Sequence, residues 1–108
     1  MKRKVVDLSN GYTKETEYLE AQRVERYYLN GKLHREDGPA IIWYYESGMQ
    51  PQEVYYYINE KSHREDGPAV IHYYRSGKIR SVHYYFNEQH VSKEEFENQM
   101  LKKKISLI

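Results

Sequence analysis

The chain has 108 residues, of which 39% are hydrophobic, 31% are charged and 15% are aromatic, and its formal net charge at pH 7 is +1. This length predicts a single domain over residues 1–108, and the balanced charge excludes a strong overall attraction to nucleic acid or to an anionic membrane. Because the chain contains no cysteine, disulfides, thiolate metal ligands and thiol catalysis are also excluded.

Residues 11–33 are interpreted as a degenerate repeat unit. Tyr27 lies 29 positions before Tyr56, whereas the first half of the segment matches the later units poorly. Terminal units of repeat proteins commonly diverge in this way. The dipeptide Asn30-Gly31 directly after the tyrosines predicts a type I′ turn, because both residues tolerate positive φ.

The next segment occurs twice. The letters His-Arg-Glu-Asp-Gly-Pro-Ala stand at residues 34–40, the first tag, and again at residues 63–69, the second tag, 29 positions later. A fixed period of this size is typical of repeat architectures, whose units bury their apolar faces against one another. The sequence therefore predicts a first complete repeat over residues 34–62 and a second over residues 63–91.

Each tag is followed by a pattern typical of a β-hairpin. A run rich in β-branched and aromatic residues comes first, then a turn with glycine, then a second strand ending in three rings. The first strands are residues 40–45 and 69–74, the turns are residues 46–48 and 75–77, and the second strands end at residues 55–57 and 84–86.

Adjacent residues of a strand point to opposite faces, so the paired aromatics place rings on both faces of the predicted sheet. By this alternation, Ile42 and Ile71 share one face, while Trp43 and His72 share the other. Cross-strand ring ladders that stabilise a thin sheet are one interpretation of these rings. A binding role for the more exposed face is the other.

The chain ends in a helical pattern. Ser92 followed by Glu95 forms a capping box, and Phe96, Met100 and Leu101 follow at helical spacing. These residues predict a capping helix over residues 92–103 that covers the last strand or part of one face. The predicted fold is therefore all-β: a single curved antiparallel meander sheet of five or six strands, with a short C-terminal α-helix cap.

The tags contain histidine and carboxylate side chains, but their order is typical of a structural loop. Asp-Gly is a turn dipeptide, and the following proline restricts φ at the start of a strand. Arg35 and Arg64 are expected to form bidentate bonds to nearby carboxylates or loop carbonyls. The serines occupy turn, cap or tail positions and form no nucleophile motif, so we expect neither enzymatic activity, nor a metal site, nor a cofactor.

The Arg-Glu-Asp-Gly-Pro-Ala tags, the Tyr-Tyr-x-Asn-Gly-Lys segment and the Val-Ser-Lys-Glu-Glu-Phe ending resemble the variant MORN-type repeat proteins of large DNA viruses, phages and bacteria. The likeness extends over about residues 24–97. It implies a scaffold of hairpin repeats with a general role in interactions, and it implies no single activity.

These features lead to the hypothesis of a non-enzymatic module that binds another protein, in its specific form a viral or phage inhibitor of a host defence component. A nucleotide or oligonucleotide sequestering protein and a structural homo-oligomer are the alternatives. The apolar runs are far shorter than about 18 residues, so we expect no membrane span and a cytoplasmic location. The residues expected to contact the partner combine aromatic side chains with arginines at the rim: Trp43, Tyr45, Tyr56, His72, Tyr74, Tyr85, Arg35 and Arg64.

Overall fold

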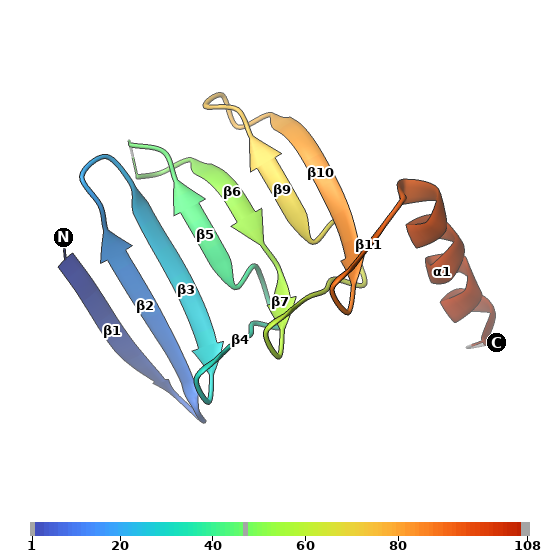
Figure 1. Ribbon diagram of the computed structural model, residues 1–108, viewed down its shortest axis with the longest axis horizontal. Helices are drawn as coiled ribbons and strands as arrows, with labels where there is room; N and C mark the ends of the chain where they lie inside the picture. Colours follow the sequence, from blue (N-terminus) through green and yellow to red (C-terminus); the bar gives the residue numbers. More distant parts are fainter. Residues whose placement is uncertain (1, 47, 107–108) are drawn as a thin grey trace.

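The computed structural model describes residues 2–46 and 48–106 (Figure 1). Eleven strands precede one helix in these ranges. The strands are β1 (Lys2–Ser9), β2 (Tyr12–Tyr18), β3 (Arg23–Leu29), β4 (Lys32–Leu33), β5 (Ile41–Tyr44), β6 (Pro51–Tyr55), β7 (Tyr57–Ile58), β8 (Lys61–Ser62), β9 (Val70–Tyr73), β10 (Ile79–Phe86) and β11 (Gln89–Val91), and the helix is α1 (Lys93–Ser106).

The predicted fold class is confirmed. The main sheet is an open antiparallel meander of nine strands in the order β1-β2-β3-β5-β6-β9-β10-β11, with β4 paired to β3, while β7 and β8 form a small separate hairpin. Figure 1 shows these strands side by side, with the helix beyond β11. The shortest extent of the backbone is 20 Å, so one layer of sheet with its loops makes up most of the molecule.

The sheet contains more strands than the five or six expected, because residues 2–18 form a hairpin of two long strands. Asn10 and Gly11, with φ values of 55° and 84°, make the turn between β1 and β2. The sequence carried this signal in the dipeptide Asn10-Gly11, which has the same residues as the recognised turn at Asn30-Gly31. Positive φ values of 49° and 81° at Asn30 and Gly31 confirm that second turn.

The two complete repeats differ in the length of their hairpin turns. Tyr44 pairs with Pro51 in the first, whereas Tyr73 pairs with Ile79 in the second, one residue sooner. Positive φ at Gly48 and Gly77 confirms the predicted turn glycines, and Ser47, part of the first predicted turn, lies outside the described residues.

Because of this shorter turn, the second strands correspond at a spacing of 28 residues and not 29. Val54 and Val82 both pair with Ile71, from either side of it. Tyr56 therefore corresponds to Tyr84. A uniform period had matched Tyr56 with Tyr85, and the register makes that match wrong.

The main hydrophobic cluster is a stripe along one face, which we call the tag face because both tags fold over it. Ile42, Val54 and Ile71 are buried side by side in register, and the rings of Tyr44, Tyr56 and Tyr73 cover them. Trp43, Glu53 and His72 share the opposite face, which we call the tryptophan face. The predicted separation of Ile42 and Ile71 from Trp43 and His72 is confirmed.

The C-terminal helix begins as predicted and extends to Ser106. The Ser92 hydroxyl accepts a hydrogen bond from the Glu95 backbone N–H at 3.1 Å, which is the capping interaction the sequence indicated. Phe96 is buried, but Leu101 is 57% exposed. The helix therefore contacts the end of the sheet through its first turns, and the rest of it projects away from the strands (Figure 1).

Candidate functional site

The first tag is a compact loop built around the guanidinium group of Arg35. Its Nε donates a hydrogen bond to the Asp37 carboxylate at 3.0 Å, and its Nη1 donates to the Pro39 carbonyl at 3.2 Å. The guanidinium carbon lies 3.9 Å from the centre of the Tyr27 ring. Arg35 bonds to a carboxylate and to a loop carbonyl as predicted, but each acceptor receives one N–H and not a bidentate pair, and a cation–π contact adds to these bonds.

The second tag repeats this geometry around Arg64. Nε donates to Asp66 at 2.9 Å, Nη1 donates to the Pro68 carbonyl at 3.0 Å, and the guanidinium carbon lies 4.0 Å from the centre of the Tyr56 ring. A Cβ atom on Gly67 would approach this carbon to 2.9 Å. Glycine thus lets the arginine pack onto the backbone without a shift of its guanidinium group, and no positive φ is involved.

The histidine that opens each tag fastens it to the turn near the end of the same predicted unit. The Nδ1 atom of His34 accepts a hydrogen bond from the Asn59 backbone N–H at 3.0 Å, and His63 accepts one from Asn87 at the same distance. Because Nδ1 accepts, the proton of each neutral ring is on Nε2. The tags are therefore rigid loops held at both ends.

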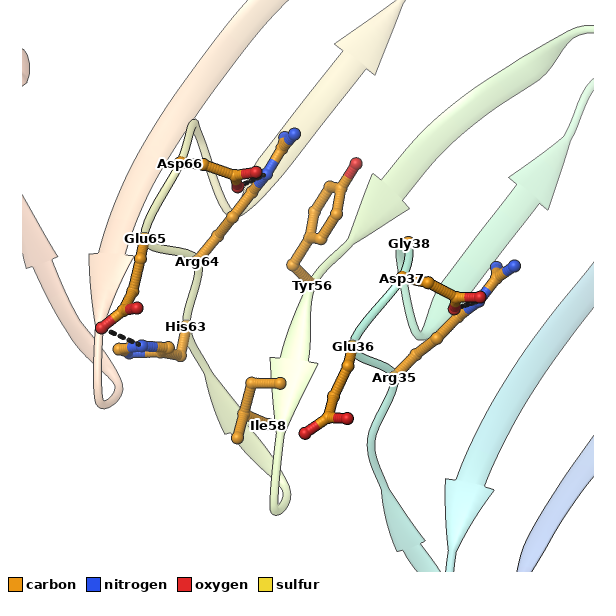
Figure 2. A pocket seen from close by; sticks show the side chains of 10 residues that line it. All are labelled: Arg35, Glu36, Asp37, Gly38, Tyr56, Ile58, His63, Arg64, Glu65 and Asp66. Carbon is orange, nitrogen blue, oxygen red and sulfur yellow. Dashed lines mark hydrogen bonds and ion pairs between the residues drawn. The ribbon is translucent and has the colours of Figure 1, made fainter.

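The two tags enclose a groove of about 660 Å³ on the tag face, which we call the tag groove. Figure 2 shows Tyr56 and Ile58 between the two loops, with Arg35 and Arg64 leaning in the same direction. The charged side chains that line it are four carboxylates and two guanidinium groups, with one histidine: Glu36, Asp37, Glu65, Asp66, Arg35, Arg64 and His63. Negative charge therefore exceeds positive charge in the groove.

A cation from elsewhere in the chain occupies one rim of this groove. The Lys103 ammonium group of α1 donates a hydrogen bond to the Glu65 carboxylate. This contact holds the pKa of Glu65 below its ordinary value, although burial acts in the opposite direction. In the first tag, Glu36 has the same position but is 74% exposed along its side chain, and it faces the Nε2 of His34 at 3.7 Å.

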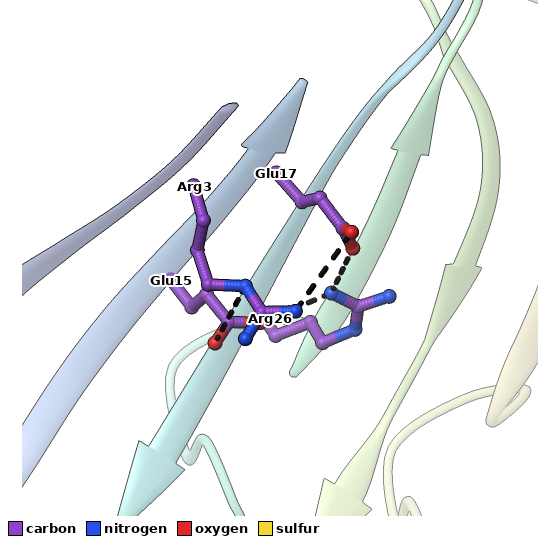
Figure 3. Close-up of polar contacts among 4 residues, drawn as sticks. All are labelled: Arg3, Glu15, Glu17 and Arg26. Atoms are coloured by element: carbon purple, nitrogen blue, oxygen red, sulfur yellow. Dashed lines mark hydrogen bonds and ion pairs between the residues drawn. The ribbon is translucent and has the colours of Figure 1, made fainter. Parts of the chain in front are cut away.

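The tryptophan face combines buried apolar side chains such as Val24 and Val70 with charged side chains that are paired with one another. At its N-terminal end, Nη1 of Arg26 donates to Glu15 and to Glu17 at 3.1 and 3.0 Å, and Arg3 approaches the same two carboxylates within 4 Å (Figure 3). This network joins the N-terminal hairpin to the repeats. The guanidinium carbon of Arg26 also lies 5.9 Å from the Trp43 ring.

Histidines line the other end of the tryptophan face. The rings of His72 and His83 are 5.8 Å apart, those of His83 and His90 are 5.5 Å apart, and Tyr85 lies 5.1 Å from His90. Among residues 2–46 and 48–106, no group of three or more histidine or carboxylate side chains is placed to hold a metal ion. In the same ranges, no helix combines the length and apolar character that crossing a membrane requires.

The structure divides the predicted contact residues among three places. Tyr56, Arg35 and Arg64 meet at the tag groove, whereas Trp43, His72 and Tyr85 lie on the tryptophan face. The two remaining tyrosines lie at the hairpin end of the sheet, where the Tyr45 hydroxyl donates to the Tyr73 carbonyl at 2.6 Å and Tyr74 is 53% exposed.

The predicted contact residues include the arginines of the tags and omit their carboxylates. Glu36 and Glu65 flank the tag groove. One signal was present: each tag has two acidic residues for a single arginine, so one carboxylate is left over. No protein-family model matches the chain, and no curated protein or solved structure is significantly similar to it. The resemblance to variant MORN-type repeats therefore stays a prediction.

Proposed function

We propose that this chain is a non-enzymatic protein-binding module whose partner docks in the tag groove. The observation that carries the proposal is the pairing of two identical rigid loops on one face of an open sheet, with Tyr56 and Ile58 between them. Loops fixed on a rigid scaffold are the usual place for recognition residues. Tyrosine and arginine, both present here, are also the side chains that contribute most to protein interfaces.

A viral or phage factor that blocks a host defence component is the specific form of this proposal. It depends on the resemblance of the tags and of the C-terminal ending to variant MORN-type proteins, and such a factor would act in the host cytoplasm. The charge of the groove favours a protein over a nucleotide as the ligand, because Glu36, Asp37 and Asp66 would repel phosphate groups.

Self-assembly is a second candidate function, favoured by the first strand of the sheet. Among the strands of residues 2–46 and 48–106, β1 pairs only with β2, so its outer edge leaves backbone groups open, and Val5 is 61% exposed beside it. Such an edge can pair with another chain, although the flanking Lys2 and Lys4 oppose this. Light scattering over a range of concentrations measures it, and a constant monomeric mass would contradict it.

Affinity capture with three forms of the protein tests the proposed groove. The wild type is immobilised beside Ile58→Ser, which changes the groove, and Trp43→Ser, which changes the tryptophan face, after urea unfolding has shown that all three fold. We expect one partner to bind the wild type and the Trp43 variant and to be lost from the Ile58 variant. Equal binding of that partner to the wild type and to Ile58→Ser would overturn the assignment.

A further inference from the structure

The positive charges of the tag groove are already neutralised within the chain. Each guanidinium group binds its own aspartate and a proline carbonyl and stacks on a tyrosine ring. What the groove presents to a partner is therefore the remaining negative charge, chiefly that of Glu36 and of the outer oxygens of Asp37 and Asp66.

The second tag shows how a cation is accommodated there. Lys103 reaches from α1 to Glu65, the third residue of that tag, and the two side chains form an ion pair. The lysine belongs to a different element from the carboxylate, so this contact is made between separate surfaces. Glu36 is the third residue of the first tag, and among the described residues it has no ion pair with lysine or arginine.

A buried polar group next to Glu36 is also left without a partner. His34 is only 5% exposed, and its Nε2 has no hydrogen-bond partner in the described part of the chain. This Nε2–H lies 3.7 Å from the Glu36 carboxylate, just beyond hydrogen-bond distance. A small rotation of Glu36 would satisfy it and would hold the carboxylate at the groove.

We propose, building on the proposed function, that the tag groove binds a lysine-bearing segment of the partner protein, whose ammonium group pairs with Glu36. The Nε2–H of His34 holds one oxygen of Glu36, and the ammonium group takes the other. Asp37 and Asp66 add negative charge, while Tyr56 and Ile58 provide apolar surface for the methylene groups of the lysine. This ion pair between two proteins is equivalent to the one that Lys103 and Glu65 form within this chain.

A hexalysine peptide is the probe for this site. It is titrated into the ¹⁵N-labelled chain at low salt, and amide shifts are followed by NMR. We expect the shifts to centre on Glu36, Asp37 and Ile58, and Glu36→Gln to raise the Kd about tenfold, as loss of a charged partner does. Glu20→Gln removes the same charge from an exposed loop outside the groove and should leave the Kd within about twofold.

A second variant tests the equivalence of the two tags. Lys103→Ala removes the internal cation from Glu65, so hexalysine should then also shift the amides of the second tag. An unchanged Kd for Glu36→Gln, or shifts centred on the tryptophan face, would overturn the inference. Binding of Lys2 and Lys4 of a second copy in the groove would also overturn the inference. Light scattering would then show a dimer for the wild type and a monomer for Glu36→Gln.

Capture of the partner by the variants separates the proposed protein-binding function from the proposed lysine contact. If the partner captured by the wild type bound Glu36→Gln equally well but was lost from Ile58→Ser, the protein-binding function would stand and the lysine contact would be wrong. If Ile58→Ser retained the partner, the groove itself would be wrong.

Discussion

The Phe96 ring of the helix packs against the Tyr84 ring, with ring centres 4.6 Å apart. In the two preceding units, an arginine packs against the corresponding tyrosine. Arg35 covers Tyr27 and Arg64 covers Tyr56 in the same manner. The third tag is absent, and the helix begins where it would stand. The helix thus ends the array of repeats by covering the last ring of the ladder.

Phe96→Ala should detach the helix. Phe96 is buried and also stacks on Phe86 at 5.4 Å, so its removal should cost about 3 kcal/mol of unfolding free energy. A helix of 14 residues is marginal by itself, and its circular dichroism signal at neutral pH should fall as well. Leu101→Ala, at an exposed position of the same helix, is the control and should change stability by less than about 0.5 kcal/mol. An equal effect of both variants would contradict this account of the cap.

Gly67→Ala should destabilise the chain through Arg64 alone. The added Cβ would lie 2.9 Å from the guanidinium carbon, so the arginine must shift and its contact with Tyr56 weakens, at a cost of about 1–2 kcal/mol. In the background of Arg64→Ala the clash disappears. There the same substitution should stabilise by about 0.4–1 kcal/mol, because alanine restricts the unfolded chain. Urea unfolding of the double-mutant cycle measures this, and a cost that persisted without the arginine would refute the packing argument.

Glu60→Gly should stabilise the protein. Glu60 has a φ of 67° in the turn after Asn59, a conformation that a side chain disfavours by about 1–2 kcal/mol. Glycine removes that strain but loses more freedom on folding, so the net gain should be about 0.5–1 kcal/mol. The urea midpoint reports it. Lys61→Gly, in the adjoining strand β8, is the control and should lower the midpoint.

Acid should destabilise the sheet partly through Glu25. Burial opposes its ionisation, but the Tyr44 hydroxyl at 2.7 Å and the Lys14 ammonium at 2.9 Å outweigh burial and lower its pKa from the ordinary value of 4.5. A lowered folded pKa means that the stabilisation is complete above the ordinary value and is lost as the pH falls through the folded one.

Tyr44→Phe removes one of the three groups that lower the pKa of Glu25, the others being Lys14 and Arg23. The variant should lose about 1.5 kcal/mol at neutral pH, as expected for a hydrogen bond to a charged group, and should lose less further stability on acidification than the wild type. Urea midpoints at about pH 7 and about pH 3 measure both effects. Tyr74→Phe, at an exposed ring, is the control. A pH dependence identical to that of the wild type would show that the Tyr44 hydroxyl does not stabilise the ionised form of Glu25.

Turns and caps were predictable because their signals are local. The glycine and asparagine turns, the Ser92 cap and the two hairpins follow from residues adjacent in sequence, and they are where the sequence placed them. The N-terminal hairpin was not predicted because β1 precedes the predicted units and the first half of residues 11–33 matches the later units poorly, although the Asn10-Gly11 turn was visible.

The candidate site depended on relationships that no local pattern encodes. Tyr56 and Tyr84 correspond at a spacing of 28 residues because the hairpin turn of the second repeat is one residue shorter and shifts the strand register. This register places Tyr85 on the tryptophan face. The role of Gly67 follows from where Arg64 packs.

By itself the amino-acid order determined a repeating antiparallel sheet with a helical end, because alternation, turn residues and caps act over a few neighbouring positions. Only the tertiary structure decided which rings share a face and which carboxylates are left unpaired. It also decided that Lys103 pairs with Glu65. These depend on pairing partners far apart in the chain, and a shift of one residue in register reverses the face of every side chain that follows.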